Sequence, residues 1–224
     1  MKSTTPLQFV AYIEHVKEVA LYGTADLAFW RKELAKENLF PYNDHGRVGI
    51  LISVPQVVWK GARFNELSVS VGVSEREDGS TPDGLFLPHA FNSLRAFAWM
   101  ERVFFQTPYF YADVQVTEKP PARFAVKHGA ETAFEARMSG ERAPARAEVE
   151  HFEGPVYLPG GKYFLARISG MTDFYPFAAQ DTLSIHSREK VFQQLAESNF
   201  SAVEWRIRGD AVHGKGKTLS RKRV

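Results

Sequence analysis

Three polar side chains, Glu66, Arg102 and Tyr109, stand in segments that are otherwise rich in apolar residues. An arginine inside a cavity offers a planar fork of donors that suits a carboxylate or an enolate oxygen. A glutamate whose pKa is raised by burial can act as a general acid or base, and a phenol can donate a hydrogen bond to a developing oxyanion. These residue types predict proton transfer on a small carbonyl or carboxylate compound. Arg102, Glu66 and Tyr109 are therefore our candidate catalytic residues.

The same residues also fit a purely structural role. A buried ion pair between Arg102 and Glu66 would satisfy both charges without any ligand. Tyr111 shares a strand face with Tyr109 by the period of two, which places both phenols in the pocket or neither. Glu101 is expected to face solvent or to neutralise Arg95, and it stays outside the candidate set.

A second set of residues is predicted to line the cavity and bind the substrate. Aromatic residues make up 13% of the chain, including 18 Phe, and this content favours a pocket within the core. His89 follows Pro88 and could reach the cavity or satisfy only a loop carbonyl, and Lys162 opens a strand where a cavity mouth could lie. The predicted binding residues are Tyr111, Phe97, Phe104, Phe105, His89, Lys162 and Trp59.

Several kinds of chemistry find no support in the sequence. The chain has no cysteine, which excludes thiolate catalysis, thiolate metal ligation and disulfides. It contains no GxGxxG, P-loop or GxSxG motif, the usual signals of dinucleotide binding, phosphate binding and α/β-hydrolase chemistry. The seven His residues are dispersed, without an HxH or HExxH pair. We therefore expect neither a metal nor a cofactor.

Most of the segments that must position these residues have the β-branched and aromatic bias of strands. Within 64–73, Leu67, Val69 and Val71 alternate with polar or small residues, which predicts a strand with one wet or cavity-facing side. The predicted strands are 48–58, 64–73, 109–117, 123–128, 132–138, 163–168 and 202–208.

Three segments have helical patterns. Asp26 can cap a helix over 27–37, and Ser187 can start one over 188–199. In 93–105 apolar residues cover nearly the whole circumference, which is typical of a helix enclosed by a sheet. Thr107 precedes Pro108 and should leave helical space. The predicted fold class is α+β, with a mostly antiparallel β-sheet or barrel wrapped around a buried helix.

Two blocks of the sequence resemble the acetoacetate decarboxylase-like superfamily. In Met100-Glu-Arg-Val-Phe-Phe-Gln-Thr-Pro-Tyr-Phe-Tyr-Ala, Arg102 precedes Pro108 by six residues, as in that family. The segment 61–73 resembles the family's strand that carries a carboxylate toward the cavity, matched here by Glu66. The resemblance covers about residues 39–186, and it implies the same fold and lyase or isomerase chemistry on a small oxo acid or carbonyl compound.

The chain departs from this family where the reactive lysine is expected. The resemblance places two lysines after the proline, the first of which forms a Schiff base, but this chain has Tyr109 and Phe110. A phenol cannot form an imine, so this chemistry is lost at the usual position unless another lysine enters the cavity. Lys60, in an apolar run, and Lys162 are the two candidates, although each also fits a surface position.

The sequence predicts one domain over residues 1–214 and a basic, disordered tail over 215–224. The tail carries five Lys or Arg and no acid, whereas the rest of the chain is slightly acidic. A slightly acidic body argues against a specific nucleic-acid partner, although the tail could contact polyanions weakly. The chain lacks a signal peptide and an apolar run long enough to span a membrane, so we expect a cytoplasmic protein with no membrane partner.

Two classes of function remain. The first is an enzyme of the acetoacetate decarboxylase-like type that acts on a small carbonyl or carboxylate ligand in an apolar cavity. The second is a non-catalytic protein that binds an apolar or aromatic ligand among Phe97, Phe104, Phe105 and Tyr111. Strand edges and the excess of Phe also favour a homo-oligomer, although no pattern of residues in the sequence marks an interface.

Overall fold

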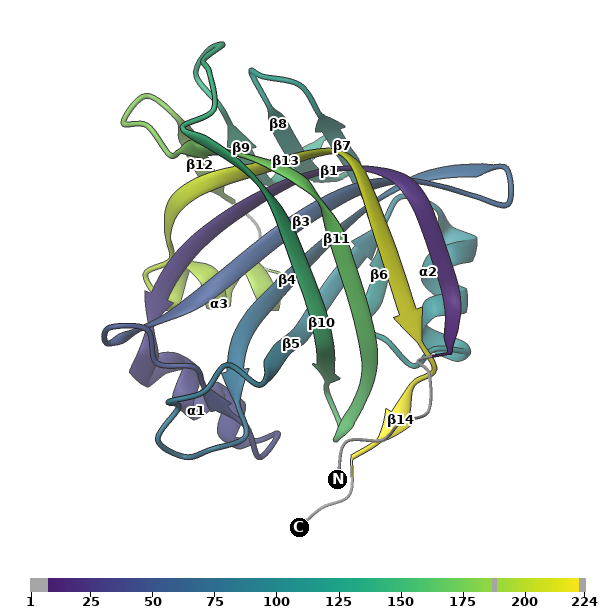
Figure 1. The fold of residues 1–224 in the computed structure, drawn as a ribbon, viewed down its shortest axis with the longest axis vertical. Helices are drawn as coiled ribbons and strands as arrows, with labels where there is room; N and C mark the ends of the chain where they lie inside the picture. Colours follow the sequence, from purple (N-terminus) through teal and green to yellow (C-terminus); the bar gives the residue numbers. More distant parts are fainter. Residues whose placement is uncertain (1–7, 187–188, 222–224) are drawn as a thin grey trace.

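The structure is a computed structural model that describes residues 8–186 and 189–221 (Figure 1). Its elements, in chain order, are β1 (Phe9–Asp26), α1 (Leu27–Ala35), β2 (Phe40–Pro41), β3 (Arg47–Trp59), β4 (Ala62–Ser74), β5 (Gly84–Asn92), α2 (Arg95–Val103), β6 (Tyr109–Tyr111), β7 (Asp113–Thr117), β8 (Arg123–His128), β9 (Glu131–Arg137), β10 (Arg146–Leu158), β11 (Lys162–Pro176), β12 (Thr182–Ile185), α3 (Lys190–Glu197), β13 (Ser201–Gly216) and β14 (Leu219–Ser220).

Seven strands of the larger sheet form a closed ring (Figure 1). Around the ring they follow the order β1, β3, β4, β5, β10, β11 and β13, and β13 pairs again with β1. Neighbours are antiparallel except β5 and β10, whose short parallel pairing closes the ring. Gly84 lies at this closure, where a Cβ would come within 2.4 Å of the Pro155 backbone oxygen, so a larger residue would push the strands apart. The sheet therefore has an outer and an inner face.

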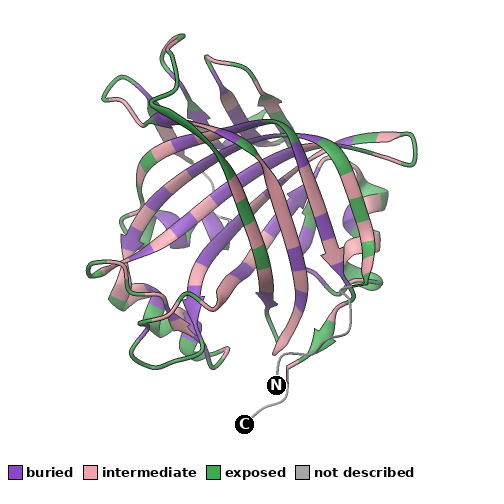
Figure 2. Cartoon of the chain, viewed as in Figure 1, coloured by how far each residue is buried: buried purple, intermediate pink, exposed green. Residues whose placement is uncertain are grey.

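The outer face packs against a second layer. This layer contains α1, α3 and a four-stranded sheet in the order β12, β9, β8 and β7. The largest hydrophobic core lies between the two layers, with Trp30 of α1, Phe192 of α3, Phe134 of β9 and Trp205 of β13 among its members. Buried and partly exposed residues alternate along the ring strands, as the purple and pink bands of Figure 2 show.

Strand β4 shows how the residue pattern decides the two faces. Leu67, Val69 and Val71 belong to the outer core, whereas Glu66 and Ser68 line the interior of the ring. Successive side chains of a strand point to opposite faces, so the alternation in the sequence becomes this division. The predicted strand with one cavity-facing side is confirmed.

The helices confirm part of the prediction. The side chain of Asp26 accepts a hydrogen bond from the Phe29 amide at 2.6 Å and caps α1, as expected. Helix α3 forms within the predicted range, but Ser187 lies outside the described residues.

Helix α2 is less buried than its composition predicts. Within the helix only Ala98 is fully buried, whereas Trp99 and the C-cap residue Phe104 are 52% and 65% exposed. The predicted α+β class with a mostly antiparallel sheet is confirmed, but α2 is not enclosed by that sheet: Phe97, Met100 and Glu101 face the interior of the ring, and the opposite side of the helix is exposed. Helix α2 lies beside β6 and covers the interior from one side, which leaves its outer apolar face uncovered (Figure 1).

The predicted tail belongs to the fold as far as residue 221. Strand β13 runs to Gly216, β14 pairs with the start of β11, and the Arg221 amide donates to the Gly161 oxygen at 2.8 Å. Residues 222–224 lie outside the described part of the chain. The basic residues that predicted a disordered tail therefore begin within a packed strand, where a Cβ on Gly216 would lie 3.1 Å from the Leu165 backbone oxygen. No helix among the described residues is long and apolar enough to cross a membrane.

Phe192 offers a test of the outer core. It is fully buried and stacks on Phe134 with ring centroids 4.9 Å apart and on Phe91 with centroids 5.5 Å apart. We expect Phe192→Ala to lower the free energy of unfolding by about 3–5 kcal/mol, because it leaves a cavity between the layers. Phe104→Ala, at the exposed C-cap of α2, should change it by less than about 1 kcal/mol. Urea unfolding measures both, and equal losses would contradict this division of the core.

Candidate functional site

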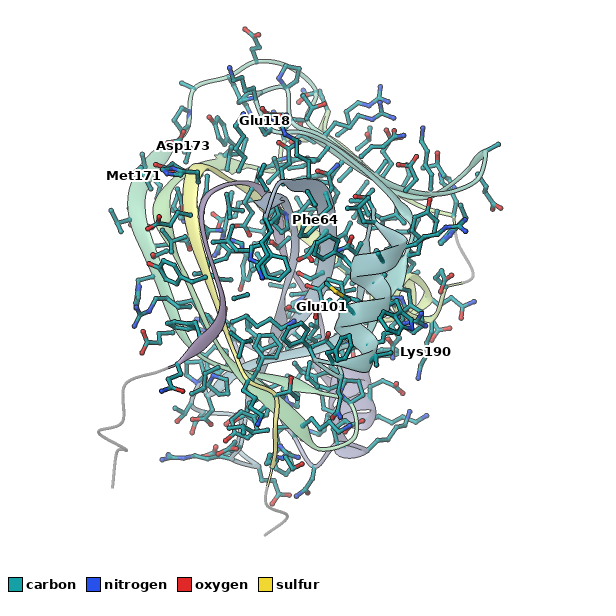
Figure 3. All side chains as sticks on the ribbon, turned by 90° about the vertical axis from the view of Figure 1, so that its right-hand side faces the viewer. Phe64, Glu101, Glu118, Met171, Asp173 and Lys190 are labelled. Carbon is teal, nitrogen blue, oxygen red and sulfur yellow. The ribbon has the colours of Figure 1, made fainter. Side chains whose placement is uncertain are left out.

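The interior of the ring contains a cavity of about 170 Å³. This is close to the volume of an engineered cavity that admits benzene, so a ligand of a few heavy atoms fits. Its walls are mainly apolar, and Figure 3 shows Phe64 and Glu101 directed into the space between α2 and the strands. Aromatic residues from five elements and from the segment after α2 contribute to the lining, namely Trp59, Phe64, Phe97, Phe105, Tyr109 and Phe164.

Glu66 and Tyr109 form the first polar pair of this cavity. The Tyr109 hydroxyl donates to Glu66 Oε2 at 3.2 Å, and Asn92 Nδ2 donates to Oε1 at 3.0 Å. Burial, together with the nearby carboxylate of Glu101, raises the pKa of Glu66 to about 7. Burial and the same carboxylates raise the pKa of Tyr109 well above its usual value, so its hydroxyl remains a donor at neutral pH.

Lys215 brings a primary amine into the cavity from β13. Its Nζ forms an ion pair with Glu101 Oε2, which also accepts a hydrogen bond from the Thr107 hydroxyl. The amine lies 4.8 Å from the centre of the Phe105 ring and 5.5 Å from that of Tyr109. Both partners of the ion pair are largely buried. The cavity therefore holds an amine, two carboxyl groups and a phenol within an aromatic enclosure.

This arrangement supplies the groups that amine chemistry on a carbonyl requires. A lysine that has lost its proton can attack a carbonyl carbon, and a neighbouring carboxyl group can exchange the protons that this reaction moves. Glu66 is suited to that exchange, because a pKa of about 7 leaves both protonation states populated near neutral pH.

A second cluster of polar side chains borders the cavity at β13 and β3. His213 lies two residues before Lys215 on β13, and Ser53 lies on β3; both line the cavity. Both side chains hydrogen-bond the fully buried carboxylate of Glu18, which also pairs with Arg208 at 2.8 Å. Burial alone would raise the pKa of Glu18, but these contacts hold it well below its usual value. Glu18 is therefore ionised inside the sheet.

Five of the residues predicted from sequence line this cavity. Glu66 and Tyr109 are joined by the hydrogen bond described above. The other three are Phe97, Phe105 and Trp59.

Arg102 and Lys162 do not line the cavity. Arg102 is exposed on α2, with its guanidinium 5.2 Å from the centre of the Phe110 ring. It lines a shallow surface depression together with Lys162 and Pro159. Arg102 therefore makes no ion pair with Glu66 and does not provide the expected fork of donors inside the ring.

Tyr111 and Phe104 also lie on the surface. The expectation that Tyr109 and Tyr111 share a location is wrong. The three-residue strand β6 ends at Tyr111, and the Tyr111 ring packs under the guanidinium of Arg95, whose Cζ lies 4.5 Å from the ring centre. Phe104 instead packs edge-on against Trp99 on the outer face of α2.

His89 points away from the cavity because β5 carries an irregularity. Its pairing with β4 shifts between Val69 and Val71, so an extra residue reverses the faces of the strand. His89 therefore stacks on Phe110, at 4.6 Å between ring centres. Burial lowers the pKa of His89 to about 4.

The lysine that enters the cavity is neither of the two predicted. Lys60 lies in the hairpin between β3 and β4 at φ +48°, with its amine over the Trp59 ring. Lys215 was assigned to the tail, and Glu101 was expected to face solvent or to neutralise Arg95. The period of two in Ala211, His213 and Lys215 was the available signal for a strand that places Lys215 inside.

Solved structures of acetoacetate decarboxylase-like proteins share this fold. An acetoacetate decarboxylase-like enzyme from Sphingomonas wittichii RW1 is 12% identical, with a TM-score of 0.58, over 94% of this chain and 93% of that one. Acetoacetate decarboxylase from Legionella pneumophila is 14% identical, with a TM-score of 0.60, over 98% of this chain and 93% of that one. A third structure is the enduracididine biosynthesis enzyme MppR complexed with the condensation product of pyruvate and imidazole 4-carboxaldehyde. It is 13% identical, with a TM-score of 0.63, over 96% of this chain and 91% of that one. The chain thus has the acetoacetate decarboxylase-like fold over nearly its whole length.

No protein-family model matches the sequence, and no curated protein matches it.

The raised pKa of Glu66 predicts a pH-dependent effect of its replacement. The pKa of Glu66 is about 7 in the native state and near 4.5 in the unfolded state. Its contribution to the free energy of unfolding is therefore fully present below pH 4.5 and is lost as the pH rises through about 7. Glu66→Gln removes that loss. Relative to the parent, the variant should therefore gain about 1–3 kcal/mol in the free energy of unfolding between pH 5 and pH 8.

Urea unfolding at several pH values measures this difference. Glu77→Gln, in an exposed turn, is the matched control and should follow the parent at each pH. Parallel pH profiles for the parent and Glu66→Gln would contradict the assigned environment of Glu66.

Proposed function

We propose that this protein is an enzyme of the acetoacetate decarboxylase-like type that acts on a small oxo acid or carbonyl compound inside the ring. The observation that carries this proposal is the buried Lys215 amine, which lies in an aromatic cavity beside Glu101. It supplies an amine to a chain that has Tyr109 and Phe110 after Pro108. The reaction class is a lyase or isomerase reaction that proceeds through an imine at Lys215.

Each polar side chain has a role in this chemistry. Lys215 must give up a proton before its nitrogen attacks the carbonyl carbon, and Glu101 is the carboxylate in contact with it. Loss of water from the resulting carbinolamine requires a proton on the departing oxygen, which Glu66 can donate in its protonated form. Tyr109 holds Glu66 in place and remains a hydrogen-bond donor. The iminium then withdraws electrons from the neighbouring carbon–carbon or carbon–hydrogen bond.

The structural neighbours agree with a small oxo acid as the substrate class. Solved structures of MppR contain pyruvate and a condensation product of pyruvate. A cavity of about 170 Å³ matches a compound of that size. The alternative, a binding protein for an apolar ligand, is supported by the aromatic lining, and the experiments below separate the two.

Borohydride trapping tests the imine. The protein is incubated with acetoacetate or pyruvate and sodium borohydride, and intact mass followed by peptide mapping locates any adduct. We expect one reduced adduct on Lys215, because this amine lies within the cavity. Lys215→Gln should abolish it.

Lys162→Gln is the matched control, since Lys162 lies in the surface depression and should not affect trapping. Circular dichroism checks that both variants fold. An adduct on Lys60 or Lys162, or no adduct with any oxo acid in a small panel, would overturn the proposal.

Replacement of Glu66 separates an enzyme from a binding protein. If Glu66 moves protons during catalysis, Glu66→Gln should lower the turnover of the best oxo acid by about 10²–10⁴-fold. Calorimetry should show that a non-reactive carboxylic acid of the same size still binds. Ligand binding that is equal in the parent and the variant, without turnover in either, would favour the binding protein.

A further inference from the structure

His213 has an environment that the proposed imine chemistry does not use. Its ring lines the same cavity as Lys215, and its Nε2 lies 3.2 Å from Glu18 Oε2. The imidazole is only partly accessible, with 21% of its side chain exposed. Glu18 is completely enclosed by the sheet and cannot contact a ligand itself. A carboxylate therefore stands behind an imidazole that faces the cavity.

The contacts of Glu18 decide which nitrogen of His213 carries the proton. Glu18 Oε2 is ionised and has no hydrogen to donate, so His213 Nε2 must donate to it. In the neutral ring Nδ1 then has the free lone pair. Ser53 and Arg208 also donate to this carboxylate, which limits its movement. Glu18 is thus a positioning residue that leaves Nδ1 as the basic atom of the imidazole.

The spacing along β13 places this base beside the amine. Side chains two residues apart on a strand point to the same face, with Cα atoms about 7 Å apart. His213 and Lys215 both line the cavity, where Gly214 between them exposes only backbone atoms, and a Cβ on Gly214 would meet the Phe9 ring on the neighbouring strand. A ligand of three or four carbons joined to Lys215 can therefore extend toward His213. Glu66 lies on β4 and approaches the amine from a different strand.

We propose that His213 is the general base that removes a proton from the carbon next to the imine, so that the protein forms an enamine on Lys215. This inference rests on the proposed function, because it needs the imine. It narrows the substrate class to oxo acids and ketones that carry at least one hydrogen on the α-carbon.

The step is balanced within the cavity. His213 Nδ1 accepts the α-proton, and the electron pair of the broken C–H bond forms the carbon–carbon double bond of the enamine. The electrons of the C=N double bond move to the Lys215 nitrogen and neutralise the iminium charge. Return of a proton from the imidazolium to the carbon reverses the step, and Glu18 stabilises the imidazolium in between.

Exchange of the methyl protons of pyruvate for deuterium tests the base. Pyruvate is incubated with the protein in D₂O, and proton NMR follows the methyl signal. Borohydride trapping is measured on the same samples. We expect the parent protein to exchange these protons and to be trapped at Lys215. His213→Asn should still be trapped, but its exchange should be about 10²–10⁴-fold slower.

His151→Asn is the matched control, because this exposed histidine on β10 lies outside the cavity, and it should exchange like the parent. Trapping with unchanged exchange in His213→Asn overturns this inference and leaves the proposed function intact. The absence of trapping in the parent overturns both. Loss of trapping in a folded His213→Asn, and also in His213→Gln, assigns the histidine to imine formation and overturns its role at the α-carbon.

Discussion

The parallel pairing of β5 with β10 is the constraint on which the site depends. It joins only two residues of each strand, Leu85 with Val156 and Phe86 with Tyr157, yet it converts an open sheet into a ring. Enclosure removes water from the inner face, and this desolvation is the main reason why the pKa of Glu66 is high. Without the closure, the carboxyl groups and the amine would be ordinary solvated side chains.

The ring strands separate the hydrophobic core on their outer face from the cavity on their inner face. The outer core is filled by side chains such as Phe134 and Trp205 and holds the two layers together. The inner face keeps small and polar residues, including Ser53 and Ser68, where the cavity remains. Each strand contributes to both interiors through its alternating side chains, so the residues that stabilise the fold and those that shape the cavity are immediate neighbours in sequence.

The sequence was most informative where a pattern is local. Alternation over 64–73 and the cap at Asp26 predicted β4 and α1, and the resemblance led to Glu66. Long strands such as β1 were missed because their charged residues make pairs that only the assembled sheet creates, as Glu18 does with Arg208. The irregularity that turns His89 outward also depends on pairing between strands. Lys215 was missed for the same reason, since β13 forms only between β1 and β11.

The position of Lys215 bears on how such cavities change over time. In a closed ring the inward side chains of all the strands converge on one small volume, so an amine can enter that volume from many points along the chain. Lys215 enters from the last long strand, more than a hundred residues beyond Tyr109 and Phe110. A column-by-column comparison of such chains would not align an amine on β13 with one placed after Pro108, because the two positions lie on different strands.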